Sequence, residues 1–119
     1  MSRGTCVLVV DDDPAIRDII GTVLEDEGYR VEHAANGREA LDTADRCRPH
    51  AVVLDVMMPV LDGWEFLAHW SKRPVEQRAP VLVVSAVGGS QSAVALGARD
   101  FLAKPFDLET LLAKLAGLL

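Results

Sequence analysis

The sequence has little that would place it outside the class of ordinary globular domains. No apolar run approaches the ~18 residues of a membrane span, and Met1 to Cys6 lacks the basic start and apolar core of a signal peptide. Lysine and arginine form no cluster and the net charge is −6, so nucleic-acid binding through a basic face is not expected. We therefore expect a cytoplasmic protein that binds neither membranes nor nucleic acid directly.

Cysteine is also scarce. Cys6 and Cys47 stand alone, without the spacing of a zinc site or a redox motif. We interpret both as reduced thiols in or near the core, with a disulfide or metal role as the alternative. The histidines, His33, His50 and His69, are scattered and predict no metal or catalytic pair.

The remaining composition is that of one folded domain. The chain has 119 residues, of which 50% are apolar and 25% charged, and no segment is low in complexity. This length is sufficient for a single hydrophobic core. We therefore expect one domain over residues 1–119, without an internal repeat or a linker.

Short apolar runs rich in valine and leucine alternate with segments of helical period. Near-continuous runs are typical of strands covered on both faces, whereas the alternating run Arg30–Ala34 indicates an edge strand. The predicted strands are Thr5–Val10, Arg30–Ala34, Ala51–Leu54, Val81–Ser85 and Asp100–Ala103. The segments between and after them predict five helices. Five βα units imply an α/β fold, a doubly wound parallel sheet with helices on both faces.

Capping residues mark where the helices should begin. The signals are Asp13-Pro14, Asn36-Gly37, Asp62 and Asp107. Apolar stripes should face the sheet, including Ile16, Ile19, Ile20, Val23 and Leu24 on the first helix and Phe66, Leu67 and Trp70 on the third. The fourth helix, Ser90–Leu96, is expected to be short.

Polar residues follow the predicted strands at their carboxyl ends. Asp11 and Asp12 follow the first strand, Asp55 the third, Ser85 ends the fourth and Lys104 follows the fifth. Neighbouring acids repel by roughly 3 kcal/mol per pair at ~5 Å and an effective dielectric of ~20, so a cation is expected among them. Oxygen ligands suit Mg²⁺, and the set suits transfer of a phosphoryl group onto a carboxylate.

Five motifs in this order resemble a known family, the receiver domain of two-component response regulators, including chemotaxis regulators. They are Val9-Val10-Asp11-Asp12-Asp13, Leu54-Asp55-Val56-Met57-Met58-Pro59 with Asp62-Gly63, Val84-Ser85-Ala86, Gly97-Ala98 and Lys104-Pro105-Phe106. The resemblance covers essentially the whole chain. It implies a single flavodoxin-like (βα)5 domain with strand order 2-1-3-4-5.

The resemblance also assigns the chemistry of the site. Asp55 is expected to accept a phosphoryl group from a phosphohistidine on a sensor histidine kinase or phosphotransfer protein. Asp11, Asp12 and Asp55 are expected to hold Mg²⁺, with the backbone carbonyl of Met57 as a further ligand. These roles are carried over from the family and do not follow from spacing alone.

Three further residues are expected to act after phosphorylation. The Ser85 hydroxyl should reach the new phosphoryl oxygen, Lys104 should pair with it, and Phe101 should turn inward as the switch aromatic. The Lys104–Pro105 bond is expected to be cis. The segment between Ser85 and Lys104 is shorter than usual for the family by roughly one helical turn, so a standard output face is in doubt.

The function expected is a Mg²⁺-dependent switch that relays a signal to an output partner or effector domain, with possible homodimerisation on phosphorylation. It would not turn over an external substrate. The alternative is a receiver-like interaction or dimerisation module that signals without phosphorylation. A phosphatase of the haloacid dehalogenase type is disfavoured. Such an enzyme would need a second aspartate two places after Asp55 as acid and base, and the sequence there is Val56-Met57.

Overall fold

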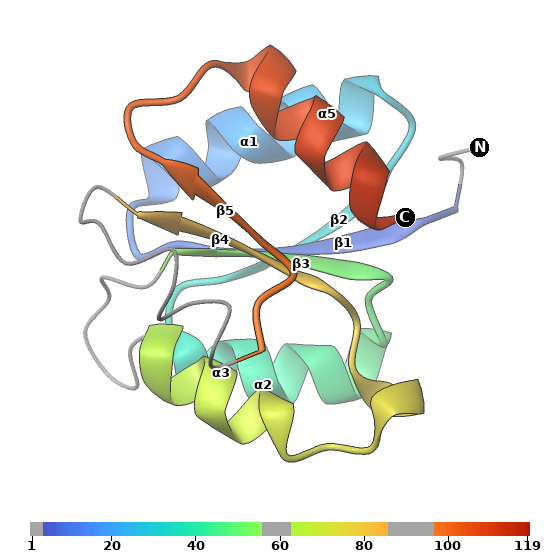
Figure 1. Cartoon of the computed structure of the whole chain (residues 1–119). Helices are drawn as coiled ribbons and strands as arrows, with labels where there is room; N and C mark the ends of the chain where they lie inside the picture. Colours follow the sequence, from blue (N-terminus) through green and yellow to red (C-terminus); the bar gives the residue numbers. More distant parts are fainter. Residues whose placement is uncertain (1–3, 56–62, 86–96) are drawn as a thin grey trace.

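The computed structural model describes residues 4–55, 63–85 and 97–119 (Figure 1). Five strands pair in parallel in the order β2-β1-β3-β4-β5. They are β1 (Cys6–Val10), β2 (Arg30–Ala34), β3 (Ala51–Asp55), β4 (Val81–Ser85) and β5 (Asp100–Ala103). The predicted order and the edge position of Arg30–Ala34 are confirmed. The third strand extends one residue further than predicted, so that Asp55 is its last member.

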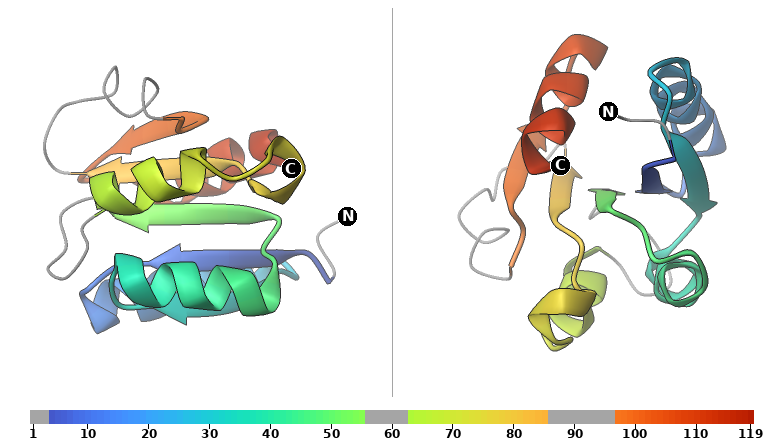
Figure 2. Two further views of the ribbon diagram at one scale, coloured as in Figure 1. Left: turned by 90° about the horizontal axis from the view of Figure 1, so that it is seen from below. Right: turned by 90° about the vertical axis from the view of Figure 1, so that its right-hand side faces the viewer.

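Helices cover both faces of this sheet. Helices α1 (Pro14–Asp26) and α5 (Leu108–Leu118) lie on one face, and α2 (Gly37–Cys47) and α3 (Gly63–Ser71) lie on the other (Figures 1 and 2). A 3-10 turn, η1 (Val75–Gln77), connects α3 to β4. No helix in the described ranges is long and apolar enough to span a bilayer.

Side-chain caps explain where three of the helices begin. The side chain of Asp13 accepts hydrogen bonds from two amides of the first turn of α1, and the side chains of Asn36 and Asp107 each accept one from the first turn of α2 and α5. Each cap satisfies amides that have no partner within the helix. The predicted Asp62 cap and the helix over Ser90–Leu96 lie outside the described residues.

The core consists of two apolar layers, one on each face of the sheet, because alternate residues of a strand point to opposite sides. One layer contains Leu8, Val10, Leu54, Phe66, Leu67 and Trp70. The other contains Val7, Val9, Ile20, Leu24, Leu111 and Leu115. The predicted burial of the third helix through its apolar stripe is confirmed.

The predicted stripe on α1 was too wide. Ile20 and Leu24 are buried, whereas Ile19 is 52% exposed and therefore contributes to the surface. Cys6 is buried, Cys47 is half-buried, and both are free thiols. These two cysteines therefore lie in or near the core, as predicted.

Candidate functional site

Strand register brings the acids together. Val10 of β1 is the parallel partner of Leu54 of β3, so the next residues, Asp11 and Asp55, lie side by side at the carboxyl edge of the sheet. The direction in which strands are added to the sheet reverses at this point. β2 lies on one side of β1, whereas β3, β4 and β5 follow on the other side. Open α/β sheets bind their ligands at such switch points.

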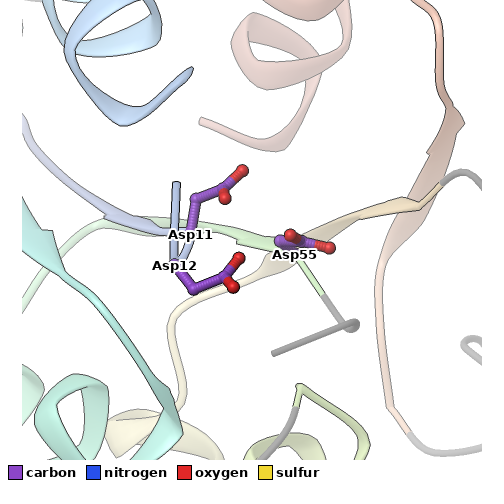
Figure 3. A group of neighbouring side chains, drawn as sticks. All are labelled: Asp11, Asp12 and Asp55. Atoms are coloured by element: carbon purple, nitrogen blue, oxygen red, sulfur yellow. The ribbon is translucent and has the colours of Figure 1, made fainter. Parts of the chain in front are cut away.

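Three carboxylates meet there. Each of Asp11, Asp12 and Asp55 offers one oxygen that lies within 4.8 Å of the others (Figure 3). Asp11 and Asp55 are only 3% and 5% exposed, whereas Asp12 is exposed. Because water screens the two buried acids poorly, the cluster concentrates negative charge in a small volume.

One ammonium group among the described residues faces two of these acids. Lys104, which follows β5, places its Nζ 3.5 Å from Oδ2 of Asp55 and 3.7 Å from Oδ2 of Asp11. Lys104 and Asp55 are 49 residues apart in the chain. The ammonium offsets one of three negative charges, so the cluster retains an excess of two.

The backbone holds Asp11 firmly in place. Its N–H donates to the carbonyl of Ala34 at 3.1 Å, and its Oδ1 accepts from the N–H of Asp13 at 2.9 Å. The carbonyl oxygen of Asp11 accepts a hydrogen bond of 2.7 Å from Nη1 of Arg17. Sequence reasoning did not single out Arg17, since a lone arginine near the start of a helix has no distinctive pattern.

Burial raises the pKa of Asp11, and the neighbouring carboxylates of Asp55 and Asp12 act in the same direction. The hydrogen bond from Asp13 and the charge of Lys104 oppose this rise of the pKa without cancelling it. These surroundings therefore disfavour the charged form of Asp11 relative to a solvated carboxylate. A bound divalent cation would reverse this preference by supplying the missing positive charge.

The donor set fits Mg²⁺. This ion takes oxygen ligands at about 2.0–2.1 Å in octahedral geometry, so two of its ligand oxygens lie about 3–4 Å apart. The carboxylate oxygens of Asp11, Asp12 and Asp55 already lie within 4.8 Å of one another. The fourth predicted ligand, the carbonyl of Met57, lies outside the described residues.

The structure also places the predicted switch residues. Ser85 ends β4, and its backbone is the register partner of Ala103, immediately before Lys104. Phe101 of β5 is the register partner of Val83 of β4. Its side chain is half-buried and packs against the core layer that α2 and α3 cover. The Lys104–Pro105 peptide bond is cis, as predicted. The two predicted switch residues therefore lie on the neighbouring strands β4 and β5.

A surface cavity of about 460 Å³ adjoins this site. It lies between α1 and the segment that connects β5 to α5, and its lining is almost entirely apolar. The lining residues are Ile16, Ile19, Ile20, Lys104, Pro105, Phe106 and Leu108. Lys104 thus lines this cavity and also contacts the acid cluster.

Comparisons with known proteins agree with this geometry. The family model described as the response regulator receiver domain matches residues 7–116. The response regulator MprA of Mycolicibacterium vanbaalenii is 48% identical over 116 residues, which are 95% of this chain and 49% of that protein. The chain therefore spans about half the length of this curated relative.

Solved structures give the same result. The chemotaxis response regulator CheY4 of Vibrio cholerae superimposes with a TM-score of 0.89 at 39% identity, covering 98% of this chain and 99% of that chain. The receiver domain of the Francisella response regulator 1452 gives a TM-score of 0.89 at 32% identity, covering 97% and 96%. Both likenesses extend over nearly the whole length of each chain.

Proposed function

Because the chain belongs to the response regulator receiver domain family, we propose that Asp55 accepts a phosphoryl group from the phosphohistidine of a sensor histidine kinase or a phosphotransfer protein. The phosphorylated form then acts on an effector protein or domain, or on a second copy of the chain. Receiver domains are signalling switches and not metabolic enzymes. The observation that supports Asp55 most directly is its buried carboxylate, 3.5 Å from Lys104 and within 4.8 Å of two further acids.

The proposed transfer is a displacement at phosphorus. A carboxylate oxygen of Asp55 attacks the phosphorus atom, the bond from phosphorus to the imidazole nitrogen breaks, and that nitrogen keeps the electron pair. Lys104 then pairs with the phosphoryl oxygens. A Mg²⁺ ion held by Asp11, Asp12, Asp55 and the Met57 carbonyl would offset the negative charge that the acids and the phosphoryl group bring together.

The proposed response uses Ser85 and Phe101. The hydroxyl of Ser85 gains a hydrogen-bond partner only when Asp55 carries the phosphoryl group, and this differential contact shifts the equilibrium between two conformations. Phe101 turns further into the core as Ser85 moves. The position of Ser85 at the carboxyl end of β4, with Phe101 on the neighbouring strand β5, supports this proposal.

The apolar cavity beside Lys104 is the surface that we assign to the phosphodonor protein. A protein donor must bring its phosphohistidine to Asp55, and Lys104 links this cavity to Asp55 directly. Exposure of the large apolar side chain of Ile19 at this point is consistent with burial against a partner.

Acetyl phosphate with Mg²⁺, read by intact mass, tests the assignment. Wild-type protein should gain one phosphoryl group and Asp55→Asn none, while Asp45→Asn, an acid on α2 outside the cluster, should label like the wild type. Labelling of Asp55→Asn would refute the assignment of Asp55. A wild-type protein that stays unlabelled would instead favour an interaction module that signals without phosphorylation.

A further inference from the structure

We propose that Arg17 is a positioning residue for the metal site: by holding the carbonyl of Asp11, it orients the peptide that carries Asp12 toward the cation. The inference rests on the proposed function, because it concerns the Mg²⁺ site of that function. It assigns a role to a residue that contacts neither the cation nor the phosphoryl group.

The location of Arg17 is unusual for a cation. It lies in the first turns of α1, where its own N–H donates to the carbonyl of Asp13 at 3.0 Å. The amino end of a helix carries partial positive charge, which disfavours a cation there. Helical side chains point back toward the amino end, and this direction brings the guanidinium to the loop that carries the acids.

Within the described part of the chain, the guanidinium makes one hydrogen bond. Its Nη1 donates to the carbonyl oxygen of Asp11 at 2.7 Å, while its Nε is buried without a hydrogen-bond partner among the described residues. Burying a donor without a partner is unfavourable. We infer that the hydrogen bond to Asp11 holds the guanidinium in this position, since it offsets the unfavourable burial of Nε.

That contact controls the peptide between the two acids. The N–H of Asp11 and its Oδ1 are already fixed by Ala34 and Asp13, so the hydrogen bond from Arg17 fixes the remaining backbone polar group of Asp11, its carbonyl oxygen. The plane of the peptide that joins Asp11 to Asp12 is thereby set. Because Asp12 is exposed, packing does not direct its carboxylate, and the backbone conformation must do so.

The charge of Arg17 has a different expected effect from its hydrogen bond. If the charge dominated, removing Arg17 would strengthen Mg²⁺ binding by removing a nearby cation. If positioning dominates, as we infer, removing Arg17 weakens binding. The sign of the change therefore separates the two effects.

Isothermal titration with Mg²⁺ tests the inference on wild type, Arg17→Met and Arg17→Lys. Arg17→Met keeps the aliphatic stem but loses the donors, and it should raise the Mg²⁺ Kd about 10-fold, the lower range for residues that orient metal ligands. Arg17→Lys keeps a donor and should recover most of the affinity. Arg38→Met removes a cation from the start of α2, at the same edge of the sheet, and should leave the Kd unchanged.

A thermal melt without Mg²⁺ verifies that each variant is folded, and Arg17→Leu, which also lacks a donor, replaces Arg17→Met if the latter does not fold. Unchanged or tighter Mg²⁺ binding in the folded variant would overturn the role of Arg17. Failure of lysine to recover affinity would also overturn it, since the hydrogen bond would then not be the cause. A wild-type protein that binds no Mg²⁺ would instead refute the metal site of the proposed function.

Discussion

Removing one acid from the cluster should stabilise the metal-free protein. In Asp12→Asn, the side chain keeps its size but no longer repels Asp11 and Asp55. In bulk water, two unit charges separated by the observed limit of 4.8 Å repel by about 0.9 kcal/mol, and two neighbours give about 1.7 kcal/mol. We use the dielectric of water because Asp12 is exposed.

One effect opposes this gain. Asp12 precedes the amino end of α1, where a negative charge is stabilising by about 0.3–1 kcal/mol. Repulsion remains the larger effect, so the net gain in the free energy of unfolding should be about 1 kcal/mol. For a domain of this size, that corresponds to a rise of about 4 °C in Tm.

Thermal melts with and without Mg²⁺ measure both consequences. The wild type should gain stability with Mg²⁺, by about 2.7 kcal/mol at a concentration of 100 Kd, whereas Asp12→Asn should lose most of that response. Asp18→Asn, which removes an exposed acid of α1 outside the cluster, is the matched control and should retain it. A lower Tm for metal-free Asp12→Asn, or an undiminished Mg²⁺ response, would refute the electrostatic argument.

Three further outcomes are expected. Lys104→Ala should still be stabilised by Mg²⁺ in a melt but should lose the change in hydrogen exchange that phosphorylation causes in the wild type; an unaltered change would contradict the role of the ammonium. Ile19→Ser should slow phosphoryl transfer from the kinase more than labelling by acetyl phosphate, and an equal effect on both rates would exclude the apolar cavity as the docking surface. The pKa of Asp107 is lowered because its carboxylate accepts hydrogen bonds from the N–H and side chain of Thr110. Its stabilisation is therefore complete above the ordinary pKa of 3.8 and is lost as the pH falls through the lowered value. Asp107→Ala should accordingly reduce Tm near neutral pH and approach the wild-type Tm in strong acid, and a Tm difference that grows on acidification would contradict this linkage.

Local chemistry made several features predictable from the sequence. The caps at Asp13, Asn36 and Asp107 depend only on residues within one helical turn, and each forms as expected. Strand positions followed from runs of valine and leucine, because such runs are buried wherever the sheet is covered on both faces. The alternating pattern of Arg30–Ala34 likewise identified an edge strand before any neighbour was known.

Strand order required more than local chemistry. Periodicity implied a parallel sheet, but the order β2-β1-β3-β4-β5 was expected from the family resemblance and not from the pattern of residues. The same sequence signals are compatible with other strand orders. Strands pair through backbone hydrogen bonds, which any neighbouring parallel strand can supply. The position of Asp55 beside Asp11 depends on that order.

The tertiary structure decided the contacts that no local pattern contains. It brings Lys104 to 3.5 Å from Asp55 across 49 residues of chain, a pairing that only the family resemblance had implied, and it directs the guanidinium of Arg17 to the carbonyl of Asp11. It also leaves Ile19 exposed, although periodicity placed that residue on the buried stripe of α1. A helical pattern predicts which residues share a face, but the width of the neighbouring sheet and the position of α5 determine how much of that face is covered.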